Sequence, residues 1–147
     1  MRPLVPPAAV RTAGLVLLAG CAWLVSAADD SPDANIGLGI LLLGALVLAV
    51  VVWAAVDGVR TARQGRPDRD GLVVWLLTAA AFGLLTAGAT GVGVAVTGGA
   101  DGAVPLGALL SASFTWGGFV AVPAALAYGL ARTLTDLRRG RSLGRRG

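Results

Sequence analysis

The sequence predicts an all-α membrane protein: a four-transmembrane-helix bundle with up-down topology and both termini in the cytoplasm. The composition is 56% hydrophobic and 14% charged, with a mean hydropathy of +0.78, which lies outside the range of soluble domains. Residues 57–70 form a long polar break, and each half of the chain beside it contains two apolar segments. The 147 residues are expected to form a single transmembrane domain, since they are too few for an additional soluble domain.

The first apolar segment, residues 12–28, lies at the short end of what can cross a hydrocarbon layer of about 30 Å. Two other interpretations stay open for it. Residues 18–21 have the form of a lipoprotein-processing site, with Cys21 as the lipidated amino terminus, and residues 26–28 resemble a signal-peptidase site. A retained helix is favoured over lipidation because the chain stays apolar after Cys21, where exported lipoproteins usually turn polar.

Three further segments complete the predicted bundle. The second, residues 36–56, carries no charge and is the clearest spanning helix of the chain. The third, residues 71–98, and the fourth, residues 104–131, are long enough to tilt in the membrane or to extend into water. Residues 132–147 are rich in arginine and are expected to form a basic cytoplasmic tail.

The arginines determine the predicted orientation. All 12 cations are arginine, and lysine, glutamate and histidine are absent, a usage that we take as typical of GC-rich bacterial genomes. With the amino terminus inside, every arginine lies on one face, and the outer links carry only aspartates. The positive-inside rule then predicts a plasma (inner) membrane protein with cytoplasmic termini. Because the arginines flank apolar segments, the expected charged partners are anionic lipid headgroups of the inner face and not nucleic acid.

Small residues at four-residue spacing predict where two helices pack. In lipid, helices associate where small side chains let their backbones approach closely. If the third and fourth segments are antiparallel, a stripe on one is level with a stripe on the other, and we expect the two stripes to face each other. Chance alignment is the other interpretation, because the whole chain is rich in glycine and alanine. The two stripes consist of Gly83, Ala87 and Gly91, and of Gly107, Ser111 and Thr115.

Hydroxyl side chains gather on the same two segments. Thr86 and Thr90 fall at about the depth of Trp116, and Ser113 and Thr115 lie nearby on the fourth segment. One expectation is a small solvated or ligand-accepting pocket around Trp116. The other, which is the commoner arrangement, is that each hydroxyl donates a hydrogen bond to a carbonyl of its own helix.

The sequence lacks the side chains that membrane chemistry usually needs. Arg11 and Asp57 fall at the edges of their segments, so no ionisable residue lies well inside a span, where a proton relay or an ion-coupled carrier would need one. Without histidine, and with Cys21 as the single cysteine, neither an intrachain disulfide nor a zinc cluster can form. We therefore expect no enzyme activity, no cofactor, and no catalytic, cofactor-binding or metal site.

Two functions remain compatible with the sequence. The leading expectation is a small non-catalytic structural or accessory subunit, either as a homo-oligomer or bound to a larger membrane protein. The alternative is a passive pore or carrier for a neutral or lipophilic solute. A pore predicts wet, uncharged faces around Thr86, Thr90 and Ser113, whereas an accessory subunit predicts a dry face of small residues bound to another protein.

Overall fold

The computed structural model describes residues 5–27, 32–65, 68–96 and 104–144. Within these ranges the chain forms four helices, which are α1 (Val5–Ala27), α2 (Pro32–Arg63), α3 (Asp68–Val96) and α4 (Leu106–Gly144). Each helix contains a stretch that is long and apolar enough to cross a membrane. The all-α class with four such helices is therefore confirmed, and it indicates a multi-pass membrane protein.

The helices extend beyond the apolar segments that define them in the sequence. α1 begins ahead of residue 12, with Pro6 and Pro7 in its first turn, where a missing amide donor costs no helical hydrogen bond. α2 continues past Val56 into the predicted polar break, and α4 includes most of the predicted tail. Residue 28 of the first predicted segment, residues 97 and 98 of the third and the end of the tail after residue 144 lie outside the described residues, as do part of the acidic link 29–35 and all of the link 99–103.

α2 ends in a turn that requires glycine. Gly65 has a φ of 62°, in the left-handed region that residues with a Cβ rarely adopt. Its amide donates to the carbonyl of Ala62 at 3.2 Å, and the amide of Gln64 donates to the carbonyl of Arg60 at 3.0 Å. These hydrogen bonds satisfy two of the carbonyls that the end of a helix leaves without partners. The turn therefore stops α2 five residues ahead of α3, the start of which is Asp68.

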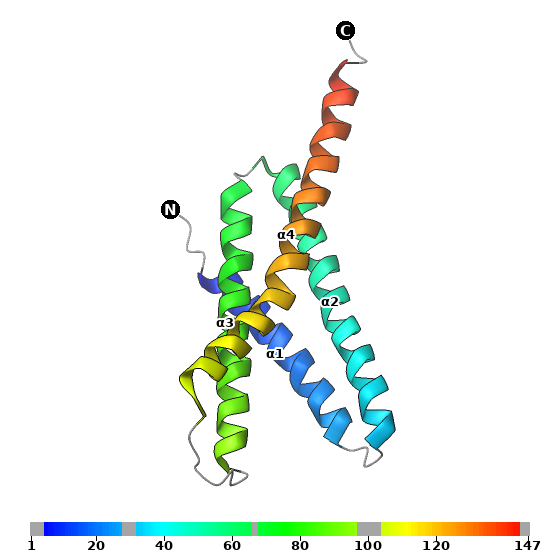
Figure 1. The fold of residues 1–147 in the computed structure, drawn as a ribbon. Coiled ribbons are helices and arrows are strands. Elements are labelled where there is room, and N and C mark those ends of the chain that lie inside the picture. Colours follow the sequence, from blue (N-terminus) through cyan, green and yellow to red (C-terminus); the bar gives the residue numbers. More distant parts are fainter. Residues whose placement is uncertain (1–4, 28–31, 66–67, 97–103, 145–147) are drawn as a thin grey trace.

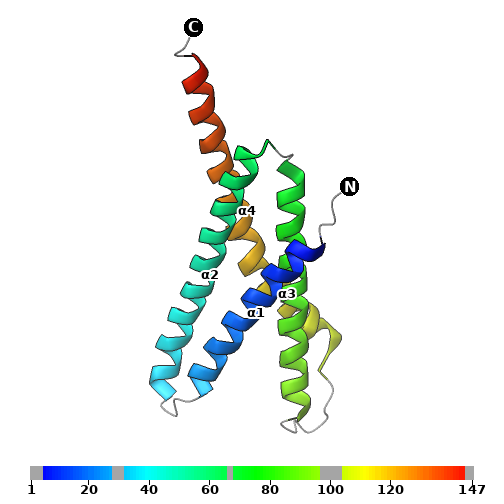
Figure 2. The ribbon, with the colours of Figure 1, turned by 180° about the vertical axis from the view of Figure 1, so that it is seen from behind.

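α4 connects the rest of the bundle. It packs along both α2 and α3, whereas α1 packs mainly against α3 and α2 touches α3 little. In Figure 1 the first part of α4 lies beside α3 and its later part beside α2, and its carboxyl-terminal end projects beyond the other helices. Figure 2 shows α1 running obliquely between α2 and α3. The oblique path of α4 thus holds α2 and α3 in one unit.

The core lies in the half of the molecule nearer to the end of α2 and the start of α3. Toward the opposite end, the α1–α2 pair and the α3–α4 pair diverge (Figure 1). α3 is the most buried of the four helices, since 39% of the residues in an apolar 18-residue stretch of it are buried within the chain, against 17% in the corresponding stretch of each other helix. The buried core side chains are Leu15, Leu46, Val50, Ala54, Trp75, Ala79, Phe82, Val120, Ala124 and Tyr128.

Candidate functional site

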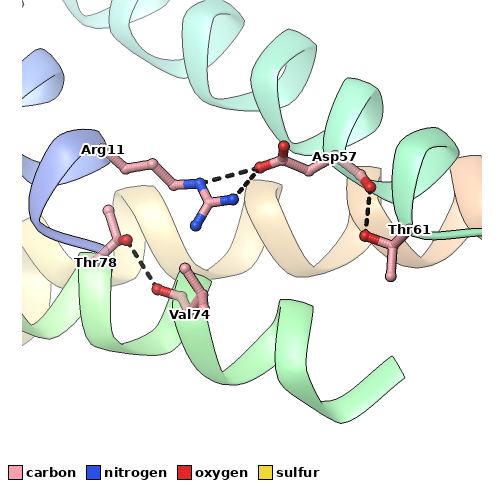
Figure 3. A network of polar contacts seen from close by, with 5 residues as sticks. All are labelled: Arg11, Asp57, Thr61, Val74 and Thr78. Atoms are coloured by element: carbon pink, nitrogen blue, oxygen red, sulfur yellow. Dashed lines mark hydrogen bonds and ion pairs between the residues drawn. The ribbon is translucent and has the colours of Figure 1, made fainter. Parts of the chain in front are cut away.

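An ion pair joins α1 to α2 beside the core. Arg11 donates hydrogen bonds from Nε at 3.0 Å and from Nη2 at 2.6 Å to Oδ2 of Asp57 (Figure 3). Only 14% of each side chain is exposed. One turn further along α2, the hydroxyl of Thr61 donates to the backbone carbonyl of Asp57 at 2.7 Å. Two charges that the sequence leaves at the edges of separate segments therefore form one partly buried pair.

Trp75 lies next to this ion pair, and Trp53 packs against Trp75. The guanidinium carbon of Arg11 is 5.2 Å from the ring centre of Trp75, which is within the range of a cation–π interaction. Trp75 meets Trp53 edge to face, with ring centres 6.3 Å apart and ring planes at 89°. Gly14 permits this arrangement, since a Cβ at that position would lie 3.2 Å from the Trp53 ring. Arg11 thus contacts side chains of both α2 and α3.

Three buried polar atoms in this region have no hydrogen-bond partner among the described residues. They are Nη1 of Arg11, Oγ1 of Thr12 and Nε1 of Trp75. Guanidinium and indole nitrogens only donate, and a hydroxyl can donate as well. A buried donor without a partner costs about 1–3 kcal/mol. An acceptor such as a water molecule would satisfy these donors.

An apolar hollow of about 420 Å³ opens between α1 and α3 in the diverging half. The three residues that the sequence singles out as a pocket, Thr86, Thr90 and Trp116, all line this hollow. A second hollow of about 170 Å³ lies between α1 and α2, and Trp116 also lines it. The other residues around the larger hollow are Val16, Ala19, Gly20, Trp23, Phe82, Leu85 and Ala89.

The hydroxyl groups near the larger hollow are satisfied within their own helices. Thr86 donates to the carbonyl of Phe82 at 2.8 Å, and Thr90 donates to the carbonyl of Thr86 at 2.9 Å. Thr78, Ser113 and Thr115 likewise donate to the carbonyl four residues earlier. Because these protons have partners in the helix, the hydroxyl donors of this hollow do not need water.

α3 brings its small-residue stripe against α4. Gly83 and Ala87 are buried. A Cβ added to Gly83 would meet the carbonyl oxygen of Ser113, and it would lie 3.0 Å from the amide nitrogen of Gly117. A Cβ added to Gly91 would lie 3.0 Å from a methyl group of Leu109. The two backbones therefore approach each other closely at Gly83, where a side chain has no space.

α4 presents a different face to α3 from the one that the spacing indicates. Its residues Gly107, Ser111 and Thr115 are exposed, and the contact with Gly83 is made by Ser113 and Gly117. The buried residues of α4, which include Val120, Ala124 and Tyr128, lie on the face that continues from Gly117 at helical spacing. The larger side chains of the core thus determine which small residues of α4 meet α3.

Tyr128 marks a junction of α2, α3 and α4 that sequence reasoning missed. Its side chain is fully buried. A Cβ added to Gly58 of α2 would lie 2.5 Å from the carbonyl oxygen of Tyr128, and one added to Gly71 of α3 would overlap the end of its ring. In the sequence, the sign of this junction is a glycine just after the second apolar segment, Gly58, and another at the start of the third, Gly71. Glycine at such positions leaves room for a large side chain from another helix.

Cys21 lies exposed on α1, and α1 is helical on both sides of it. Within the described ranges, no three side chains among His, Cys, Asp and Glu come close enough together to hold a metal ion.

Fold and site together define a class of protein: a multi-pass helical membrane protein whose four helices share a core at one end and diverge at the other. No protein-family model, curated protein or solved structure matches the chain.

Proposed function

We propose that the chain is a plasma (inner) membrane protein of four up-down spans with both termini cytoplasmic, and that it acts as a non-catalytic structural or accessory subunit. The orientation is supported by charge. The arginines of the sequence belong to the amino-terminal segment, the α2–α3 region and the end of α4, and the positive-inside rule assigns all three to the cytoplasm. In Figure 1 the ends of α2 and α4 and the start of α3 lie toward the same end of the molecule.

One observation carries the accessory role: the diverging half presents an apolar hollow in which the hydroxyls already have helical partners. Thr86 and Thr90 donate to their own helix, so their protons do not require water. A dry surface that includes small residues is what another transmembrane helix binds, because association in lipid depends on close packing. The hollow is therefore proposed as the place where a larger membrane protein, or a second copy of the chain, packs.

The alternative is a passive pore or carrier for a neutral or lipophilic solute. The volume of the larger hollow, about 420 Å³, supports this alternative, since it falls within the range of small-molecule sites. Trp23 and Trp116, which both line it, would offer ring faces to such a solute.

A cysteine at Thr90 separates the two functions. In lipid nanodiscs, a Thr90→Cys variant of a Cys21→Ala protein is treated with a water-soluble thiol reagent; Cys21 is replaced because it is exposed. The accessory role predicts protection of residue 90, and rapid labelling would support a water-filled pore. Gln64→Cys, in the exposed turn after α2, is the labelled control, and Leu48→Cys, on an exposed apolar face, is the unlabelled control.

Native mass spectrometry of the full chain, released in mild detergent from its own host, tests the accessory role directly. We expect a complex of defined stoichiometry, either with a second membrane protein or with a second copy of the chain. A closed ring of this chain alone would favour the pore, and a monomer would contradict a stable accessory complex. The mass of the chain also reports whether residues 1–28 are retained and whether Cys21 carries a lipid.

A further inference from the structure

A basic hollow lies between the end of α2 and the later part of α4. Its volume is about 480 Å³, and it is open to the surroundings of the chain. Val59 and Arg63 line it from α2, and Thr135, Arg138 and Arg139 line it from α4. Both helices contribute residues near their carboxyl-terminal ends, and the hollow forms because α4 packs along α2.

Arg139 is fixed in this hollow by the backbone of α2. It donates from Nη1 to the carbonyl of Ala62 at 2.6 Å and from Nη2 to the carbonyl of Arg63 at 3.2 Å. The carbonyl of Ala62 also accepts from the amide of Gly65, so Arg139 is its second donor. The last carbonyls of a helix carry partial negative charge, which favours a cation there. Arg139 therefore links α4 to the end of α2, and its position relative to Arg63 is set by these bonds.

Arg63 and Arg138 are both exposed, and neither guanidinium group takes part in the hydrogen bonds between Arg139 and the end of α2. No acidic residue lines the hollow among the residues that the structure describes. The nearest acidic side chain in the α4 sequence, Asp136, lies 3.7 Å from Arg132 in an ion pair along the helix. The hollow thus presents the exposed guanidinium groups of Arg63 and Arg138 beside Arg139, which is held by the carbonyls of α2.

We propose that this hollow binds the phosphate of an anionic phospholipid headgroup. Planar guanidinium groups are well suited to phosphate oxygens, and Val59 provides an apolar wall on the side of the spans. A lipid is chosen over a soluble anion because the hollow lies where the spanning stretches of α2 and α4 end, at Arg63 and Arg139. Basic pockets between transmembrane helices on the cytoplasmic side bind such headgroups. The inference rests on the proposed function for its orientation.

The test is a lipid titration of the full chain, followed by native mass spectrometry. The protein in detergent is titrated with phosphatidylglycerol and, separately, with phosphatidylcholine. We expect preferential binding of phosphatidylglycerol, and about tenfold weaker binding in the double variant Arg63→Gln/Arg138→Gln, because each arginine contributes to attraction of anionic lipid. Arg139 is left unchanged, since it also holds the end of α2.

The matched control is Arg60→Gln/Arg69→Gln, which removes the same charge at exposed positions outside the hollow. We expect this control to bind phosphatidylglycerol within about twofold of the unchanged protein. Equal loss in both double variants would indicate diffuse attraction and would overturn the site, as would the absence of any loss. Displacement of the lipid by millimolar inorganic phosphate would overturn the choice of a lipid. Circular dichroism must show that both variants keep their helices.

The outcomes for the site and for the accessory role are distinguishable. Selective lipid binding by a chain that stays monomeric would contradict the accessory role and leave the site supported. A partner complex with no effect of Arg63→Gln/Arg138→Gln on lipid binding would contradict the site alone.

Discussion

Asp57 accepts both hydrogen bonds of Arg11 on a single carboxylate oxygen, in a place where each side chain is largely buried. Such a pair stabilises less than its short distances suggest, because both ions lose hydration when they are buried. Removing one partner is different, since the other charge then stays in the same place without a counter-ion. The pair therefore matters most as a constraint on where α1 lies.

Asp57→Asn should lower the free energy of unfolding by about 2 kcal/mol, because the Arg11 guanidinium loses its charged acceptor. The measurement is thermal or denaturant unfolding in detergent, followed by tryptophan fluorescence. Asp70→Asn is the control, since Asp70 is exposed at the start of α3. The apolar double variant Arg11→Met/Asp57→Leu should recover most of the loss, because it leaves no buried charge. A double variant as unstable as Asp57→Asn would contradict this account.

Two glycines around Tyr128 should respond differently to the same methyl group. Gly58→Ala places a Cβ against the backbone carbonyl of Tyr128, whereas Gly71→Ala places it against the ring. Both should destabilise the protein by about 1–3 kcal/mol through overpacking. Tyr128→Leu should relieve the second variant and not the first, because only the ring can be shortened. Unfolding of the single and double variants measures this, and equal rescue of both would contradict the geometry.

At the scale of elements, the α3–α4 contact depends on backbone approach at Gly83. Gly83→Val should separate the two helices and cost about 1–3 kcal/mol, since its Cβ would meet the Ser113 carbonyl. Gly88→Val, on the same helix, is the matched control, because a Cβ there meets no atom within 4 Å. Cross-linking of cysteines placed on α3 and α4 reports the separation, together with unfolding. Equal effects of the two variants would indicate that small residues are not what joins these helices.

For the whole molecule, the diverging half should be filled by lipid whenever no partner is bound. Trp23 is 69% exposed within the chain, and Trp75 is 1% exposed. In vesicles that contain brominated acyl chains, a variant with Trp23 as its single tryptophan should therefore be strongly quenched, and one with only Trp75 should be quenched little. The other tryptophans are replaced by phenylalanine. Strong quenching of Trp75 would mean that the core is open to lipid.

Several features were predictable because they depend on local properties of the chain. Four apolar segments indicate four helices, since backbone groups in lipid must be satisfied within the segment itself. Hydroxyl groups in lipid also need hydrogen-bond partners, so they donate to carbonyls of their own helix, as Thr86 and Thr90 do. Thr86, Thr90 and Trp116 line one hollow. The sequence indicates that they lie at similar depth, and residues at similar depth on adjacent antiparallel helices can meet.

The contacts between helices could not be predicted in this way. The Arg11–Asp57 pair depends on the tilt of α1, and the Tyr128 junction depends on the crossing of α4 between α2 and α3. The face of α4 that meets Gly83 is set by the rotation of the whole helix, which the larger core side chains decide. Tilt and rotation follow from packing with neighbours and not from the length or apolar character of a segment. The sequence by itself thus determined how many helices form and which segments they occupy, whereas only the tertiary structure decided which of their side chains meet.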